Sequence, residues 1–212
     1  MTVNAAFFKN NRAFIAFILI TIIGFFSWRV YNVQIKGQLD RILLDPPRAL
    51  TPFHLNAGDN NPFTLEQLKG KWTFLFFGYT SCPDVCPTTL TEMATMSKLL
   101  AKSTEPNTIQ FVFISVDPER DTPEHLNNFV AYFNKTFTGA TGTIDQLNTL
   151  TRQIDIKHRR LKEQGNDYLV EHSADILLFN PQARLFARFP APHYSEEISA
   201  LFTEILKLNK DT

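Results

Sequence analysis

The stretch "FGYTSCPDVCPTTL", residues 77–90, contains both cysteines of the chain, Cys82 and Cys86. Three residues separate the two thiols, and a proline follows each of them directly. Two thiols at this spacing can form a disulfide, act as a two-electron redox couple or bind one soft metal ion. A buried, inert pair is the alternative, which the adjacent prolines disfavour because they restrict the backbone of an exposed loop. The redox couple and the metal site both stay open.

The segments on either side of this loop predict where it lies in a fold. "WTFLFFGYT", which starts at Trp72, is a continuous apolar run of strand length and predicts a buried strand. Pro87 suits the first position of a helix, and apolar residues recur after it at helical spacing: Leu90, Met93, Met96, Leu99 and Leu100. We interpret the methionines as core residues rather than as a copper-binding motif. The cysteines are therefore expected at the N-terminus of a helix, where backbone N–H groups stabilise a thiolate.

The remaining patterns alternate between strand and helix. We expect a hairpin within residues 51–64, a strand at 109–116, a helix capped by Thr122 with Pro123 in its first position, and a helix at 144–156. A strand at 175–179, its hairpin partner at 184–189 and a helix from Ser195 that starts with a capping box complete the chain. This order predicts an α/β layer structure with right-handed crossovers.

The N-terminal segment has a different character. Residues 13–31 begin with "AFIAFILITIIGFF" and predict a transmembrane anchor helix, with Trp28, Arg29 and Tyr31 at the interface. A small-residue cleavage site does not follow the run, which argues against a cleaved signal peptide. We therefore predict an N-terminal tail and anchor at 1–31, an extended linker at 32–47 closed by Pro46 and Pro47, and a soluble domain at 48–212.

Composition narrows the possible functions. The chain has 212 residues with 21 basic and 21 acidic side chains, so it lacks the basic surplus that nucleic-acid binding requires. Two cysteines are too few for a disulfide scaffold, and 20 phenylalanines are sufficient for a sizeable core.

Three separated motifs, "FGYTSCPDVCP", "SVDPERDTP" and "YLVEHSADILLF", together resemble the Sco/SenC family of copper chaperones. The resemblance covers about residues 45–208 and implies a thioredoxin-like fold with a preceding membrane anchor. It also implies a role in assembling the copper A centre of cytochrome c oxidase. The implied metal ligands are Cys82, Cys86 and His172, and the implied metal is copper, as Cu(I) or Cu(II).

The residues themselves agree with this ligand set. Of the five histidines, we interpret four as solvated or structural: His54, His125, His158 and His193. His172 is expected in a loop before the strand at 175–179, and Ala174 occupies the slot in which thioredoxin-like enzymes usually have a cis-proline. Two thiolates and an imidazole suit copper, whereas structural zinc requires a fourth protein ligand. Asp84 and Asp117 are candidate electrostatic partners or turn residues.

Two functions follow from this interpretation. The first is a membrane-anchored metallochaperone that delivers copper to the copper A subunit of cytochrome c oxidase, with other copper chaperones or a thiol reductant as further partners. The second is a thiol–disulfide oxidoreductase with Cys82 and Cys86 as its redox pair, which keeps a partner's copper-site cysteines reduced. A peroxidase is disfavoured. We expect a single-pass protein of the bacterial inner membrane with a periplasmic domain; the alternative is the mitochondrial inner membrane, facing the intermembrane space.

Overall fold

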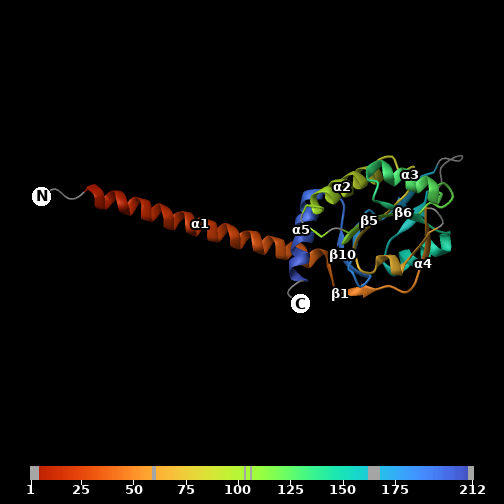
Figure 1. The fold of residues 1–212 in the computed structure, drawn as a ribbon, viewed down its shortest axis with the longest axis horizontal. Helices are drawn as coiled ribbons and strands as arrows, with labels where there is room; N and C mark the ends of the chain where they lie inside the picture. The colour runs from red at the N-terminus through yellow and green to blue at the C-terminus, as the bar shows by residue number, and fades with distance from the viewer. Residues whose placement is uncertain (1–4, 59–60, 103, 106, 162–167, 210–212) are drawn as a thin grey trace. The chain divides into compact units, whose positions relative to one another are not determined.

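The computed structural model describes residues 5–58, 61–102, 104–105, 107–161 and 168–209, with side chains from residue 14 onward. The chain divides into two compact units, Met1–Arg41 and Ile42–Thr212 (Figure 1). Each unit is described by itself.

The N-terminal unit consists of helix α1, Ala5–Ile42. Its segment Phe14–Ile42 is long and apolar enough to cross a membrane, and the side chains of residues 14–34 are exposed. Residues 32–42 are therefore helical, not the extended linker expected from the sequence. The reason is local: this stretch has no proline and only one glycine, Gly37, so no residue within it breaks the helix before Ile42. The predicted domain boundaries themselves stay a prediction.

The second unit begins with strand β1, Leu43–Ala49. Its further strands are β2 (His54–Ala57), β3 (Pro62–Thr64), β4 (Trp72–Gly78), β5 (Ile109–Ser115), β6 (Thr138–Thr141), β7 (His158–Arg160), β8 (Val170–His172), β9 (Ile176–Phe179) and β10 (Arg184–Phe189). Its helices are η1 (Leu65–Leu68), α2 (Val85–Leu100), α3 (Pro123–Phe133), α4 (Ile144–Gln153) and α5 (Ser195–Leu208).

Eight strands form one sheet in the order β1-β10-β9-β4-β5-β6-β2-β3. Strand β5 runs parallel to β4 and to β6, while β9 and β10 add an antiparallel hairpin on the other side of β4. Strand β1 is an edge strand, where proline is tolerated because one side of the strand has no ladder hydrogen bonds. Strands β7 and β8 form a separate two-stranded antiparallel ribbon.

Alternate side chains of the central strand β4 supply two apolar layers. On one face, Phe74 stacks on Phe111 and meets Phe202 of α5 edge-on. On the other, Leu75 and Phe77 belong to a core that includes residues of helix α4. Helices α2, α3 and α5 lie together on one side of the sheet and α4 on the opposite side (Figure 1). Every residue of β4 is buried, so this strand is a rigid base for the cysteine loop that follows it.

The predicted starts of α3 and α4 are confirmed, and those of α2 and α5 differ. Helix α3 has Thr122 as its cap and Pro123 in the first position, as predicted. Helix α2 starts earlier than expected: Asp84 is its N-cap, so Pro87 is in the third position. Helix α5 lacks the expected capping box, because the backbone N–H of Ser195 donates instead to Glu92 Oε2 at 2.8 Å.

Candidate metal centre

The cysteine loop joins the end of β4 to the start of α2, as the sequence predicts. Both thiols are free; Cys86 is fully buried, and Cys82 is half-buried. The backbone N–H of Cys82 donates to the carbonyl of Tyr79 at 3.3 Å and closes the turn that precedes the helix. The thiols of Cys82 and Cys86 and a ring nitrogen of His172 all lie within 4.8 Å of one another.

His172 reaches the thiols from the ribbon. It is the last residue of strand β8, which corrects its expected place in a loop, and it pairs directly with His158 of β7. Its Nε2 lies 3.5 Å from Cys86 Sγ, and its Nδ1 lies 2.9 Å from the carbonyl oxygen of Ser173. Because a carbonyl only accepts, Nδ1 carries the proton and Nε2 presents a lone pair to the thiols. This is the tautomer that a metal ligand requires.

Gly78 explains how Cys86 can lie so close to the sheet. A Cβ atom at this position would meet Cys86 Sγ at 2.5 Å and the ring of Phe113 at 2.8 Å. Only glycine therefore leaves room for the buried thiol above the end of β4. The residue was not singled out from the sequence, because a glycine at a strand end is also common in ordinary turns.

The two thiols differ in their ionisation. The hydrogen bond from the Cys86 thiol is the main reason that the pKa of Cys82 lies well below its ordinary value, although partial burial opposes this. Contact with His172 and then the backbone N–H groups of Cys86 and Asp84 lower it further. The same hydrogen bond and deep burial raise the pKa of Cys86. Cys82 is therefore the nucleophilic thiolate of the reduced pair, and Cys86 keeps its proton.

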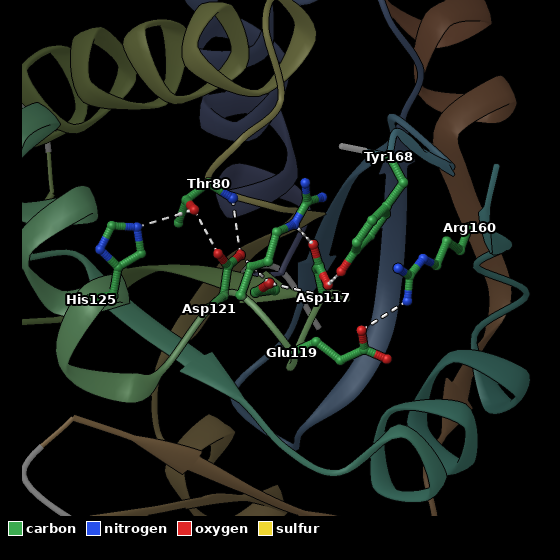
Figure 2. Close-up of polar contacts among 9 residues, drawn as sticks. Thr80, Asp117, Glu119, Asp121, His125, Arg160 and Tyr168 are labelled. Atoms are coloured by element: carbon green, nitrogen blue, oxygen red, sulfur yellow. Dashed lines mark hydrogen bonds and ion pairs between the residues drawn. The ribbon is translucent and has the colours of Figure 1, made fainter. Parts of the chain in front are cut away.

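Two carboxylates of the β5–α3 turn, Asp117 and Asp121, make polar contacts with the segments that lead to the site (Figure 2). Asp121 is 1% exposed and accepts from the backbone N–H of Thr80 at 2.9 Å, the hydroxyl of Thr80 at 2.5 Å and the hydroxyl of Ser115 at 2.5 Å. It thereby anchors the turn that leads into Cys82. The sequence interpretation missed Asp121; its signal was the second aspartate of "VDPERD".

Asp117, the first of the two carboxylates, does not contact a thiol. It is 4% exposed, accepts from the hydroxyl of Tyr168 at 2.6 Å, and is paired with Arg120. Burial and the hydrogen bond to Asp117 raise the pKa of Tyr168 to about 12, so its hydroxyl remains a donor at all physiological pH values. Asp84 contributes through its backbone N–H rather than its side chain, which makes no capping hydrogen bond.

The other histidines have structural surroundings or lie on the surface. His54 is exposed on β2, and His193 is buried between Thr89 and the carbonyl of Phe189. His125 Nε2 lies 3.1 Å from Thr80 Oγ1, so this histidine supports the cysteine turn rather than the thiols themselves (Figure 2). Among the described residues, Cys82, Cys86 and His172 are the group of three potential ligands that the fold brings together.

The chemistry of these donors favours a soft ion. Two sulfurs and one imidazole form a low-coordinate set that suits Cu(I) and accommodates Cu(II) with an added ligand. The site contains three protein donors, one fewer than structural zinc sites have. The fold and the site thus define a thioredoxin-like domain with a Cys–Cys–His centre.

Comparison with known proteins gives the family. The SCO1/SenC family matches residues 44–207. "SCO2-like protein RP587" of Rickettsia prowazekii is 32% identical over 155 residues, which cover 71% of this chain and 74% of that protein. "Protein SCO1 homolog 1, mitochondrial" of Arabidopsis thaliana is 36% identical over 138 residues, which cover 65% of this chain but only 41% of that protein.

A solved structure agrees with the sequence match. The crystal structure of Arabidopsis thaliana ScoI with copper bound superimposes with a TM-score of 0.70 at 30% identity, covering 74% of this chain and 98% of the other. The chain belongs to the SCO1/SenC family, and the predicted thioredoxin-like fold is confirmed.

Replacing Gly78 by alanine tests the close approach of Cys86. We expect Gly78→Ala to displace the thiol, to lower the free energy of unfolding by about 1–3 kcal/mol, and to weaken copper binding. Gly70→Ala is the matched control: Gly70 has φ +76°, and a Cβ there would meet nothing within 4 Å. Its strain costs roughly 1–2 kcal/mol without touching the site. Thermal unfolding and copper titration measure both effects; equal copper binding by the two variants would contradict this role of Gly78.

The ionisation of the thiols is tested by alkylation of the reduced protein. Because the pKa of Cys82 is lowered, its reaction rate with iodoacetamide should stay on its plateau as the pH falls through 7 and decline only in more acidic solution. Cys86→Ala removes the main stabilising hydrogen bond, so the midpoint should rise in that variant. Mass spectrometry of the modified cysteine follows the rate; a Cys82 midpoint near the ordinary value of about 8.5 would refute the assignment.

Proposed function

We propose that this chain is a membrane-anchored copper chaperone that binds copper through Cys82, Cys86 and His172 and delivers it to the copper A site of cytochrome c oxidase. The observation that carries the proposal is the position of His172 Nε2, 3.5 Å from Cys86 Sγ with its lone pair toward the thiols. Disulfide exchange alone has no need of a third donor at this point. Copper bound to a solved relative supports the choice of metal.

The geometry is suitable for taking up and releasing a metal ion. Cys82 is partly exposed while Cys86 is buried, so an incoming ion can meet Cys82 first and then be enclosed by Cys86 and His172. The thiolate of Cys82 is ready for binding, and the proton of Cys86 has to leave as the metal arrives. A partner's thiolate can displace the exposed ligand first, which provides a stepwise route for transfer.

Thiol–disulfide exchange is the second candidate. The lowered pKa of Cys82 beside a protonated Cys86 is the arrangement of a nucleophilic and a resolving thiol. In that reaction Cys82 attacks a partner disulfide, and Cys86 then closes the Cys82–Cys86 disulfide, so two electrons pass to the partner's cysteines. Both activities would act on the cysteines of a partner's copper site. They can be distinguished by replacing His172, because only copper binding requires this residue.

For location, we propose a single-pass protein of the bacterial cytoplasmic membrane, with the copper-binding domain in the periplasm. The support is the apolar helix segment Phe14–Ile42, together with a bacterial relative that matches over 74% of its length. The cytochrome c oxidase subunit that carries copper A is the proposed partner.

Copper titration of the three ligand variants tests the proposed function. The reduced wild type should bind one copper ion per chain, and Cys82→Ser or Cys86→Ser should abolish most binding. His172→Ala should weaken Cu(II) binding by at least about tenfold, or 1.4 kcal/mol, while Cu(I) is largely retained by the two thiolates. Stoichiometry and the visible thiolate-to-Cu(II) absorption are the measurements.

His54→Ala is the matched control, because His54 is exposed on β2 and away from the thiols. Unchanged binding of both copper states by His172→Ala would mean that the assigned site is wrong. Reduction of a partner disulfide by wild type and His172→Ala alike, without effective copper binding by either, would favour the oxidoreductase instead.

The anchor is tested by extraction of membranes with alkaline carbonate. The full chain should remain in the pellet, whereas a chain that starts at Ile42 should be released. Protease added to spheroplasts should degrade the domain of the full chain. Release of the full chain, or protection of its domain, would contradict the proposed topology.

A further inference from the structure

The ribbon that carries His172 is weakly attached to the rest of the fold by its backbone. Strands β7 and β8 have three residues each and form a two-stranded sheet of their own, outside the eight-stranded sheet. A two-stranded hairpin of this size is marginally stable by itself. Side-chain contacts must therefore decide how steadily His172 faces the thiols.

Tyr168 makes several of these contacts. It is 7% exposed, and its hydroxyl donates to Asp117 Oδ1 at 2.6 Å. The guanidinium groups of Arg120 and Arg160 lie over its ring, at 3.8 Å and 3.4 Å from the centroid. Arg160 also pairs with Glu119 at 2.8 Å, so the ribbon is joined to the β5–α3 turn by a hydrogen bond, stacking and an ion pair (Figure 2).

Tyr168 is close in sequence to His172, so contacts that hold Tyr168 also restrain His172. Tyr168 lies two residues before β8, and the backbone N–H of Leu161 donates to the carbonyl of Leu169 at 2.8 Å, so the pairing of the ribbon continues to the residue next to Tyr168. Within β8, Val170 and His172 lie on one face because side chains alternate along a strand. The ring of Tyr79 connects His172 with the β5–α3 turn, because it meets His172 edge-on at 5.9 Å and the guanidinium of Arg120 lies over it at 5.5 Å.

The same turn also holds the cysteine loop. Asp117 binds Tyr168 of the ribbon, and Asp121, four residues later, binds Thr80 of the cysteine turn. The five-residue segment 117–121 therefore fixes the histidine and the cysteines relative to one another, although they come from distant parts of the chain.

We propose that Tyr168 is a positioning residue for copper binding: through its hydrogen bond to Asp117 it holds the ribbon so that His172 Nε2 faces Cys86, and it thereby sets the affinity for Cu(II). This inference rests on the proposed copper function. The apparent affinity of a site falls in proportion to the fraction of molecules whose ligands are in place. Cu(II) is the sensitive state, because Cu(I) is held by two thiolates without the imidazole.

The test is Tyr168→Phe, which keeps the ring between the two arginines and removes only the hydroxyl. We expect Cu(II) affinity to fall about tenfold, the equivalent of 1.4 kcal/mol, with little change for Cu(I). The nitrogen hyperfine coupling in the Cu(II) electron paramagnetic resonance spectrum should weaken. Tyr168→Ala should cause a larger loss. Tyr132→Phe, at a residue that is 87% exposed, is the matched control and should leave all three measurements unchanged.

The double variant Tyr168→Phe/His172→Ala shows whether Tyr168 acts through the histidine. If it does, Tyr168→Phe causes no further loss of Cu(II) affinity once His172 is alanine. An equal loss in both backgrounds, or wild-type Cu(II) binding and spectrum in Tyr168→Phe, would overturn the inference. Failure of the copper function itself is distinguishable, because His172→Ala alone would then leave copper binding unchanged.

Discussion

The contact between Cys86 Sγ and His172 Nε2, 3.5 Å across, joins residues that are 86 positions apart in the chain. Three features of the fold make this contact possible. The buried strand β4 fixes the start of the cysteine loop, and Gly78 leaves room for the Cys86 thiol. Because Nδ1 of His172 carries the proton, Nε2 has a free lone pair that faces this thiol. A group that is both buried and polar is costly unless it has partners, so the pair of thiols and the imidazole stabilise one another even before a metal ion binds.

The support for this contact is polar and lies on one turn. Asp117 and Asp121 are almost completely buried, and each is satisfied by hydrogen bonds or an ion pair. Their placement has a functional consequence, because one carboxylate holds the histidine ribbon and the other holds the cysteine turn. The sheet places the thiols at the end of strand β4, and the turn connects them with the segment that carries His172.

The sequence was sufficient to predict the parts that depend on local patterns. The apolar run at β4, the cap and proline at α3 and the thiols at a helix start are all recognisable from residue types and spacing. The resemblance to the family, rather than periodicity, supplied His172. The structure brings it to the two cysteines as that resemblance implies.

The remaining features could not be predicted because they depend on contacts between distant segments. Strands β7 and β8 are too short to give a periodic signal, so His172 was expected in a loop. The expected linker continues α1 because no local signal ends that helix before Ile42. Asp121 and Tyr168 resemble ordinary turn and core residues until their partners are known, and the space beside Gly78 exists only in the folded chain.

X-ray absorption spectroscopy of the copper-loaded protein is the decisive measurement of the Cys82–Cys86–His172 site, because it counts the atoms bound to the metal. We expect two sulfur ligands and one imidazole nitrogen in the wild type, and loss of the imidazole signal in His172→Ala with both sulfurs kept. An imidazole that persists in His172→Ala, or fewer than two sulfur ligands in the wild type, would contradict this expectation.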